Sequence, residues 1–263
     1  MATVEHTLLA PAVPSDEHAA SPSRETRAHP LGRPVAVAAI GFVAIVIVLL
    51  VVGELLTHAL SGSVGRWDEH VNEYFARRRG TAANDVTKVS TSAFNTVPVV
   101  VAAAVLVGFL ALRRHFREAL FLVVALLIEI TAFLSVTFVV ARPRPDVVRL
   151  NSTPATSSFP SGHTAAATVL FVGIAVIVAC CTSNRLARLA SSVLAAIVVC
   201  AVGFARVYRG LHHPTDVFVG ALFGLACLAV AALAIRAFGE HRPATSERPP
   251  ERSRRSLEHA LVE

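Results

Sequence analysis

The stretch Phe159-Pro160-Ser161-Gly162-His163 is a polar turn that leads into an apolar run from residue 164 to residue 181. Ser161 is a favourable N-cap residue, so the sequence predicts a helix that begins at this turn. The free amides and positive dipole end of a helix N-terminus can cradle a phosphate, and His163 would lie in the first turn beside it. For this turn alone, a plain capped helix with an incidental histidine is an equal alternative.

The composition is that of a membrane protein. Apolar residues make up 54% of the 263 residues, and the mean hydropathy is +0.61. A helix needs about 20 apolar residues to cross a bilayer. We therefore predict an all-α bundle of six transmembrane helices, of which the second is the weakest, near residues 35–57, 97–112, 118–141, 164–181, 188–205 and 215–238.

Two polar tails flank this single membrane domain of residues 34–238. Residues 1–33 and 239–263 are rich in Arg, Glu, Ser and Pro and have no apolar periodicity. Such segments cannot bury enough surface to fold alone, so we expect both to be disordered. The first apolar run lacks a small-residue cleavage site and is expected to remain as a helix.

The distribution of Lys and Arg predicts the orientation. These residues are more numerous on the face with both tails, and Arg113, Arg114 and Arg117 crowd a short turn there. The positive-inside rule assigns this face to the cytoplasm of a plasma (inner) membrane. The Ala, Val and Arg bias is typical of a GC-rich bacterial genome. The outer face then receives Arg142, Pro160–His163, Arg206 and His212.

The charge and the cysteines exclude several classes of protein. The pI is near 9.9, but the basic residues are not aligned with stacking aromatics, so anionic lipid headgroups are favoured over nucleic acid as partners. All four cysteines fall in apolar runs: Cys180, Cys181, Cys200 and Cys227. This placement predicts core packing and argues against disulfides and a zinc site.

A second polar cluster follows the fifth apolar run. Arg206 ends that run, and Pro214 suits the first turn of the last helix. Asp216 would then lie near His212, where a carboxylate that accepts one ring N–H leaves the other nitrogen free to attack. Each of these residues alone has an ordinary structural interpretation, as an anchor at the membrane interface or as a loop residue. Together with the turn at residues 160–163, they indicate phosphoryl chemistry.

Two further features call for interpretation. Trp67, Val71, Tyr74 and Phe75 recur at helical spacing among charged residues, which predicts an amphipathic helix on the outer membrane surface. Glu129 lies near the middle of the third span, about 20 Å of helix from the predicted site. We expect it to be protonated or hydrogen-bonded rather than catalytic.

These motifs resemble the type 2 phosphatidic acid phosphatase family, whose members carry Lys-x6-Arg-Pro, Pro-Ser-Gly-His and Ser-Arg-x5-His-x3-Asp. The resemblance covers about residues 118–238. The second motif is complete at residues 160–163. The third has Ala205 in place of Ser, and the first retains only Arg142-Pro143, because Ser135 stands where Lys is expected.

The resemblance implies a metal-independent hydrolase with no cofactor that forms a phosphohistidine. His212 would be the nucleophile, Asp216 its orienting partner and His163 the acid. Phosphoryl oxygens would be held by Arg142, Arg206 and the amides of Ser161 and Gly162. The substrate would be a membrane lipid phosphate, of the phosphatidate or polyprenyl diphosphate type.

The missing lysine keeps alternatives open. Arg144 and Arg209 are candidate substitutes, although each could equally be a solvated loop residue. A catalytically silent lipid-binding or scaffold protein is one alternative function, and a lipid phosphotransferase is another. A vanadate-dependent haloperoxidase is a remote alternative, because enzymes of that class are usually soluble.

Overall fold

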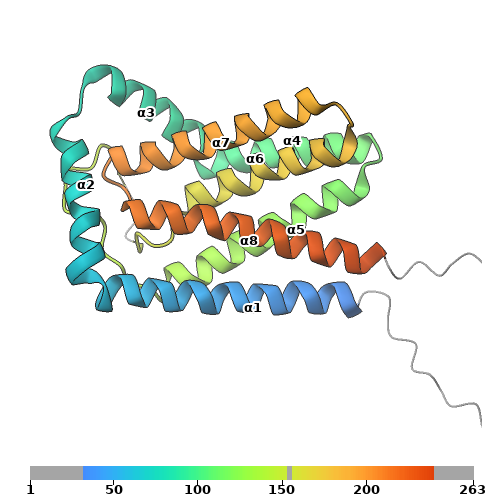
Figure 1. Cartoon of the computed structure of the whole chain (residues 1–263), viewed down its shortest axis with the longest axis horizontal. Helices are drawn as coiled ribbons and strands as arrows, with labels where there is room; N and C mark the ends of the chain where they lie inside the picture. The colour runs from blue at the N-terminus through green and yellow to red at the C-terminus, as the bar shows by residue number, and fades with distance from the viewer. Residues whose placement is uncertain (1–31, 153–155, 240–263) are drawn as a thin grey trace, which may run out of the picture.

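The computed structural model describes residues 32–152 and 156–239, and these residues form helices and no strand (Figure 1). Nearly all of both predicted tails lies outside the described residues. The helices are α1 (Gly32–Glu54), the π-helical turns η1 (Leu55–Ala59) and η2 (Ser61–Gly65), α2 (Arg66–Arg77), α3 (Thr81–Ala93), α4 (Thr96–Leu112), α5 (Phe116–Thr137), α6 (Gly162–Cys181), α7 (Arg185–Tyr208) and α8 (Pro214–Gly239).

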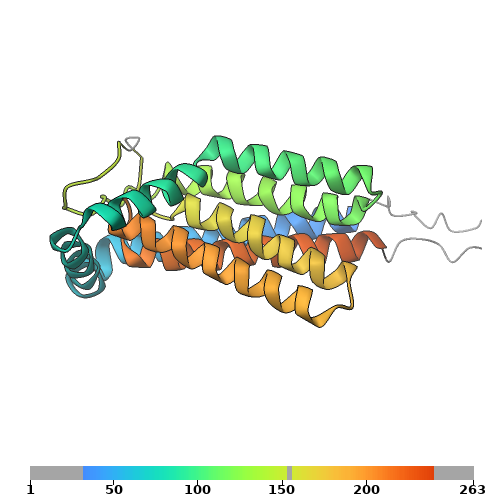
Figure 2. The ribbon, with the colours of Figure 1, turned by 90° about the horizontal axis from the view of Figure 1, so that it is seen from above.

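The long helices run side by side in a bundle, namely α1, α4, α5, α6, α7 and α8 (Figures 1 and 2). Helices α6 and α8 contact each other, and both also contact α5 and α7. The interior is apolar, with Leu122, Ala125 and Val169 fully buried, whereas Ile47, Phe109 and Leu127 are exposed on the outside. Exposed apolar side chains on long helices are what contact with lipid requires. The predicted all-α, six-span membrane fold is confirmed.

The second predicted span, which had the weakest apolar signal, is not one continuous helix. Five helices are individually long and apolar enough to cross a membrane, and α3 with α4 makes a sixth only as a pair bent by 51°. Helix α4 has 17 residues, while α3 has the sequence TAANDVTKVSTSA, which is too polar for a lipid-facing span. The third span is also shorter than predicted, because α5 ends at Thr137 rather than at residue 141.

The predicted amphipathic helix is present as α2, which lies across one end of the bundle (Figure 1). Its buried residues are polar, however. Asp68 and Asn72 face the protein, while Trp67 and Tyr74 are about half exposed. The charged face that the sequence assigned to solvent therefore points partly into the molecule.

A close helix contact fixes the same end of the bundle. A Cβ atom at Gly220 of α8 would lie 2.6 Å from the backbone oxygen of Ser161. Only glycine allows this approach, because a side chain would overlap main-chain atoms that cannot move away cheaply. The amide of Ser161 donates to the carbonyl of Asp216 at 3.1 Å, so the start of α6 is anchored to the first turn of α8.

The bundle makes the predicted orientation testable. The turn at Ser183 lies at one end, and Ser152 lies in the loop at the other. Because the arginine-rich turn favours the cytoplasm, we expect an epitope tag at Ser152 to be reachable in intact cells and a tag at Ser183 only after the membrane is opened. The measurement is antibody labelling before and after permeabilisation, and the reverse pattern would invert the topology.

Candidate active site

The turn after α7 places His212. Gly210 has a φ of +71°, in the left-handed region that glycine adopts without strain. The amide of Gly210 donates to the carbonyl of Val207 at 2.9 Å, and that of Leu211 donates to Arg206 at 3.0 Å. This is the Schellman pattern of helix termination. It reverses the chain at the end of the bundle and delivers His212 to the interior.

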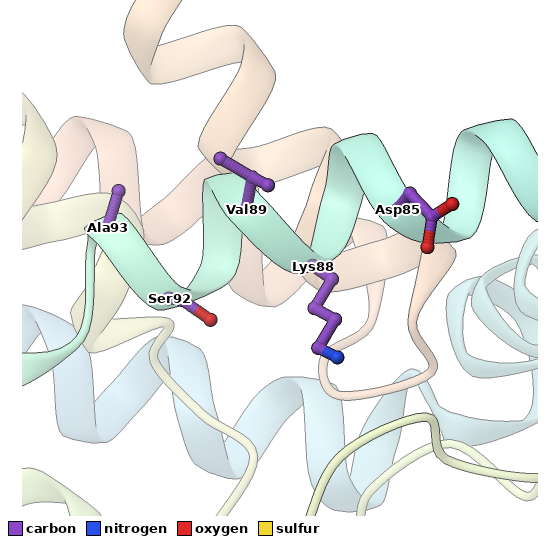
Figure 3. Close-up of a pocket in the computed structure, with 5 residues that line it drawn as sticks. All are labelled: Asp85, Lys88, Val89, Ser92 and Ala93. Carbon is purple, nitrogen blue, oxygen red and sulfur yellow. The ribbon is translucent and has the colours of Figure 1, made fainter.

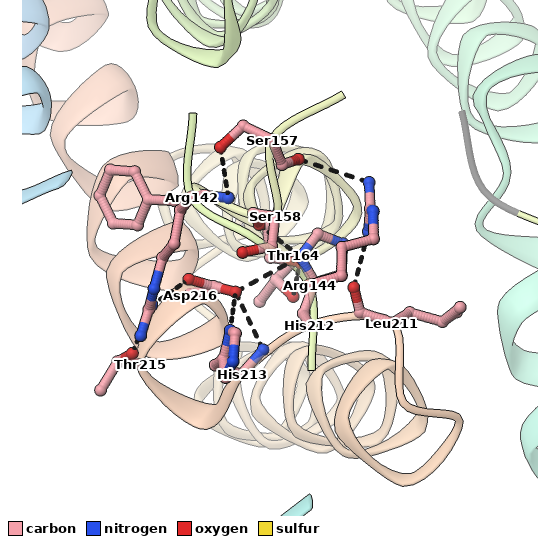
Figure 4. Close-up of polar contacts among 12 residues, drawn as sticks. Arg142, Arg144, Ser157, Ser158, Thr164, Leu211, His212, His213, Thr215 and Asp216 are labelled. Atoms are coloured by element: carbon pink, nitrogen blue, oxygen red, sulfur yellow. Dashed lines mark hydrogen bonds and ion pairs between the residues drawn. The ribbon is translucent and has the colours of Figure 1, made fainter. Parts of the chain in front are cut away.

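His212 is held as one tautomer by the loop between α5 and α6. Its Nδ1 lies 2.6 Å from the carbonyl oxygen of Ser158 (Figure 4), and the side chain is buried. A carbonyl can only accept, so Nδ1 carries the proton and the Nε2 lone pair is free. The loop is itself fixed, because Ser158 donates through its amide to Arg142 at 3.0 Å and through its hydroxyl to Pro143 at 2.8 Å.

Asp216 lies near His212 but bonds elsewhere. Its Oδ2 is 3.8 Å from His212 Nδ1, which is too long for a hydrogen bond. The same carboxylate accepts from the backbone amide of His213 at 2.9 Å and from Nδ1 of His213 at 3.2 Å. Asp216 therefore acts on His212 by charge, while the carbonyl of Ser158 sets the ring orientation.

Arg142 occupies the centre of a buried ion network. Its Nη2 donates to Asp68 at 2.7 Å, and its Nη1 donates to Asp216 and, at 2.8 Å, to the hydroxyl of Thr215 (Figure 4). Only 4% of Arg142 is exposed. Both terminal nitrogens are thus engaged, which differs from the free phosphate ligand expected from the sequence.

Two acids of α2 complete this network, and the sequence did not identify them. Asp68 accepts from the amide of Thr215 at 3.1 Å and from its hydroxyl at 2.6 Å, so it caps the start of α8 from another helix. Glu69 accepts from Nε2 of His213 at 3.0 Å. The only available signal was the spacing of Asp68 and Asn72 on one helical face.

The two adjacent histidines have opposite electrostatic settings. Burial, followed by the charges of Arg206 and Arg144, lowers the pKa of His212 well below its ordinary value. Burial also lowers the pKa of His213, but hydrogen bonds and charge from Asp216 and Glu69 outweigh it, so that this pKa is raised. His212 is therefore neutral near pH 7, whereas the charged form of His213 is favoured.

Arg206 and Arg144 offer unused donors. The Nε atoms of both are buried and have no hydrogen-bond partner among the described residues. Arg144 donates through Nη1 to the carbonyl of Leu211 at 2.6 Å, which places it beside His212. Arg209, the other candidate substitute for lysine, is instead bound to Asn84, Thr87, Leu150 and Asn151. Ser135 is exposed and donates to its own helix at Thr131.

The start of α6 brings His163 to the same pocket. It lies close enough to His212 that a charged His163 would lower the pKa of that ring, and its Nε2 lies 3.2 Å from Oδ1 of Asn95. Ser161 is the N-cap residue, but its hydroxyl pairs with Thr164 at 3.0 Å and caps no amide. Its own amide is taken by Asp216, unlike the expected phosphate contact. Gly162 and His163, in the first turn, have no intrahelical acceptor for their amides.

Two other features lie apart from these residues. An open hollow of about 570 Å³ on α3 is lined by Asp85, Lys88, Val89, Ser92 and Ala93 (Figure 3). All five residues come from one helix, and none belongs to the pocket around His212. Glu129 is buried in α5 and makes no ion pair within the described part of the chain.

Comparison with known proteins relates this geometry to a family. Residues 118–240 match the family model of the PAP2 superfamily. The fold is similar to a transmembrane PAP2 type phosphatidylglycerolphosphate phosphatase from Bacillus subtilis, with a TM-score of 0.59 and 20% identity over 81% of this chain and 98% of that one. It is also similar to LpxE from Aquifex aeolicus, with a TM-score of 0.50 and 24% identity over 62% of this chain and 93% of that one. No curated protein matches the sequence significantly.

The ion network predicts that two acids of α2 differ greatly in how much they contribute to stability. Asp68→Asn leaves the buried Arg142 with one charge partner fewer, and breaking a buried pair costs about 3–5 kcal/mol. Glu73→Gln removes an exposed i,i+4 pair with Arg77, worth about 0.3–0.5 kcal/mol. Thermal unfolding in detergent should show a clear loss for Asp68→Asn and almost none for Glu73→Gln. Equal midpoints would contradict the assigned role of Asp68.

Proposed function

Because residues 118–240 make this chain a member of the PAP2 superfamily, we propose that it is an integral membrane phosphatase that hydrolyses a lipid phosphate or diphosphate through a phosphohistidine on His212. The observation that carries this proposal is the hydrogen bond from His212 Nδ1 to the carbonyl of Ser158. It leaves Nε2 unprotonated among a cluster of side chains that includes the buried Arg206 and the half-buried Arg144. PAP2-superfamily membership supports the class of reaction, and the fold supports the membrane setting.

In the first step, the lone pair on Nε2 of His212 attacks phosphorus, and the bond from phosphorus to the lipid oxygen breaks. His163 donates its proton to that departing oxygen. The imidazole becomes positively charged, and the carboxylate of Asp216, 3.8 Å from Nδ1, stabilises that charge without a proton transfer. The products are a phosphohistidine and the free lipid alcohol or lipid monophosphate.

In the second step, His163 takes a proton from water, and the water oxygen attacks phosphorus. The bond from Nε2 to phosphorus breaks, its electron pair returns to His212, and inorganic phosphate leaves. Splitting hydrolysis in this way replaces one difficult displacement by two easier ones. The proton that His163 gives in the first step is recovered in the second.

The charge on the transferring group would be held by Arg206 and Arg144. Their unpaired Nε atoms are donors that a phosphoryl oxygen can satisfy, and the amides of Gly162 and His163 are further donors. Arg144 would thus supply the charge that Ser135 does not. Fixed donors of this kind stabilise the spread charge of the transition state without a metal ion.

The membrane setting favours lipid substrates. The site lies at the end of the bundle opposite to the arginine-rich turn. Since that turn favours the cytoplasm, our proposal puts the site at the outer face of the plasma membrane. A lipid there can present its phosphate to His212 while its chains stay in the bilayer. A polyprenyl diphosphate is the preferred substrate in our proposal, since two phosphates would balance the charge of Arg206 and Arg144 better than one, and phosphatidate is the next.

The direct test is phosphate release by the purified protein from polyprenyl diphosphate, phosphatidate and a soluble phosphomonoester, with and without EDTA. His212→Ala and His163→Ala should each reduce turnover at least about 100-fold, since general acid–base and covalent catalysis contribute that much or more. His58→Ala, an exposed histidine paired with Glu54, should be unchanged. If none of the three substrates releases phosphate, the scaffold alternative is favoured. Inhibition by EDTA that magnesium reverses would contradict the proposed metal-independent mechanism.

The pH profile tests the electrostatics separately. His212 must be neutral to attack, and its lowered pKa places the acid limb of kcat/KM below the ordinary histidine value of about 6.5. Arg144→Gln removes a nearby positive charge, so the pKa of His212 should rise and the limb should move to higher pH. Arg149→Gln, on the exposed part of the same loop, is the control. An unmoved limb in Arg144→Gln would show that this charge does not act on the nucleophile.

A further inference from the structure

At the end of the bundle away from His212, three side chains of different chemistry converge. Cys181 is the last residue of α6, and His115 and Glu118 begin α5. The Sγ atom of Cys181 lies 4.0 Å from Nδ1 of His115 and 4.0 Å from Oε1 of Glu118. Nδ1 of His115 lies 3.8 Å from Oε2 of Glu118. The three groups therefore face one point.

We propose that Cys181, His115 and Glu118 form a zinc site. Thiolate, imidazole and carboxylate are the three protein ligands that zinc takes, at about 2.0–2.3 Å. Tetrahedral angles with those bond lengths put ligand atoms roughly 3.3–3.6 Å apart. With one ligand atom counted for each residue, the three atoms lie within 4.8 Å of one another, so side-chain rotations that move these atoms by roughly an ångström would close the set. Water would occupy the fourth position.

The backbone holds all three ligands in register. Arg114 adopts a left-handed φ of 62°, which turns the chain sharply before α5. The carbonyl of His115 then accepts from Ala119 at 3.0 Å, so His115 and Glu118 lie on one face at i,i+3 spacing. Cys181 is fixed by the end of α6, where Thr182 donates to Val178 at 3.1 Å. A bound zinc ion would link the α4–α5 turn to α6.

Charge and accessibility both permit binding. Cys181 is exposed, unlike Cys227, so the predicted packing role fits only the latter and the site is open to solvent. Binding releases one thiol proton, and the resulting thiolate with the Glu118 carboxylate neutralises the two positive charges of zinc. Arg113, Arg114 and Arg117 oppose a cation at this end of the bundle, and Arg113 is turned over the Phe109 ring.

The site is separate from the proposed catalytic pocket, so the two proposals stand independently. A test uses the whole protein in detergent, stripped with chelator and titrated with Co²⁺ as a spectroscopic substitute for zinc. Wild type should bind one equivalent with a thiolate-to-cobalt absorption band. Zinc should displace the cobalt and abolish the band.

Ligand variants decide whether these residues form the site. Cys181→Ser should lose the band, and His115→Gln should weaken cobalt binding by at least about tenfold, as expected for loss of a metal-ligand contact. Cys200→Ser and His58→Ala, both exposed elsewhere, should match wild type. Thermal unfolding of each variant without metal checks that it folds. No band in wild type, or a band that persists in Cys181→Ser, would overturn the proposal.

Discussion

The site depends on a buried guanidinium between two carboxylates. Arg142 joins Asp68 of α2 to Asp216 of α8, and Thr215 contacts both Arg142 and Asp68. Desolvating three charges is costly, so such a network is retained more readily for what it positions than for stability. Here it places α2 across the end of the bundle and aims the second oxygen of Asp216 at the two histidines. Removing either carboxylate would leave Arg142 with one charge partner fewer in a buried position.

Because both terminal nitrogens of Arg142 are engaged in this network, our proposal gives the phosphate to other residues. The pocket around His212 offers Arg206 and Arg144, whose Nε atoms are buried without partners in the described chain. Within the described residues, neither forms an ion pair with a carboxylate as Arg142 does, although Asp216 is near enough to act on Arg144 by charge. Arg142 therefore holds the helices of the site together, whereas Arg206 and Arg144 remain available to bind an anion.

The sequence predicted the bundle and the residues that gather at its end, because apolar runs and short motifs are local signals. It did not predict the partners of those residues. Asp68 and Glu69 belong to an amphipathic segment, and periodicity alone assigns a charged face to solvent. The positions of the Ser158 carbonyl and of the unpaired Arg144 Nε depend on how residues 138–152 and 156–161 fold back, which is decided by tertiary contacts. Cys181, expected in the core, lies at a helix end.

The charges around His212 do not balance, and the surplus is positive. The favoured charged form of His213 is matched by Asp216 and Glu69, and Arg142 by Asp68 and Asp216, so these cations need no ligand. Arg206 and Arg144 remain as excess positive charge beside a neutral His212. The buried Nε atoms of these two residues have no hydrogen-bond partner among the described residues, which is costly, and a phosphate that supplies both charge and acceptors would remove that cost. Under the proposed function, these side chains would bind an anion before any chemistry begins and would present it to the unprotonated ring nitrogen of His212.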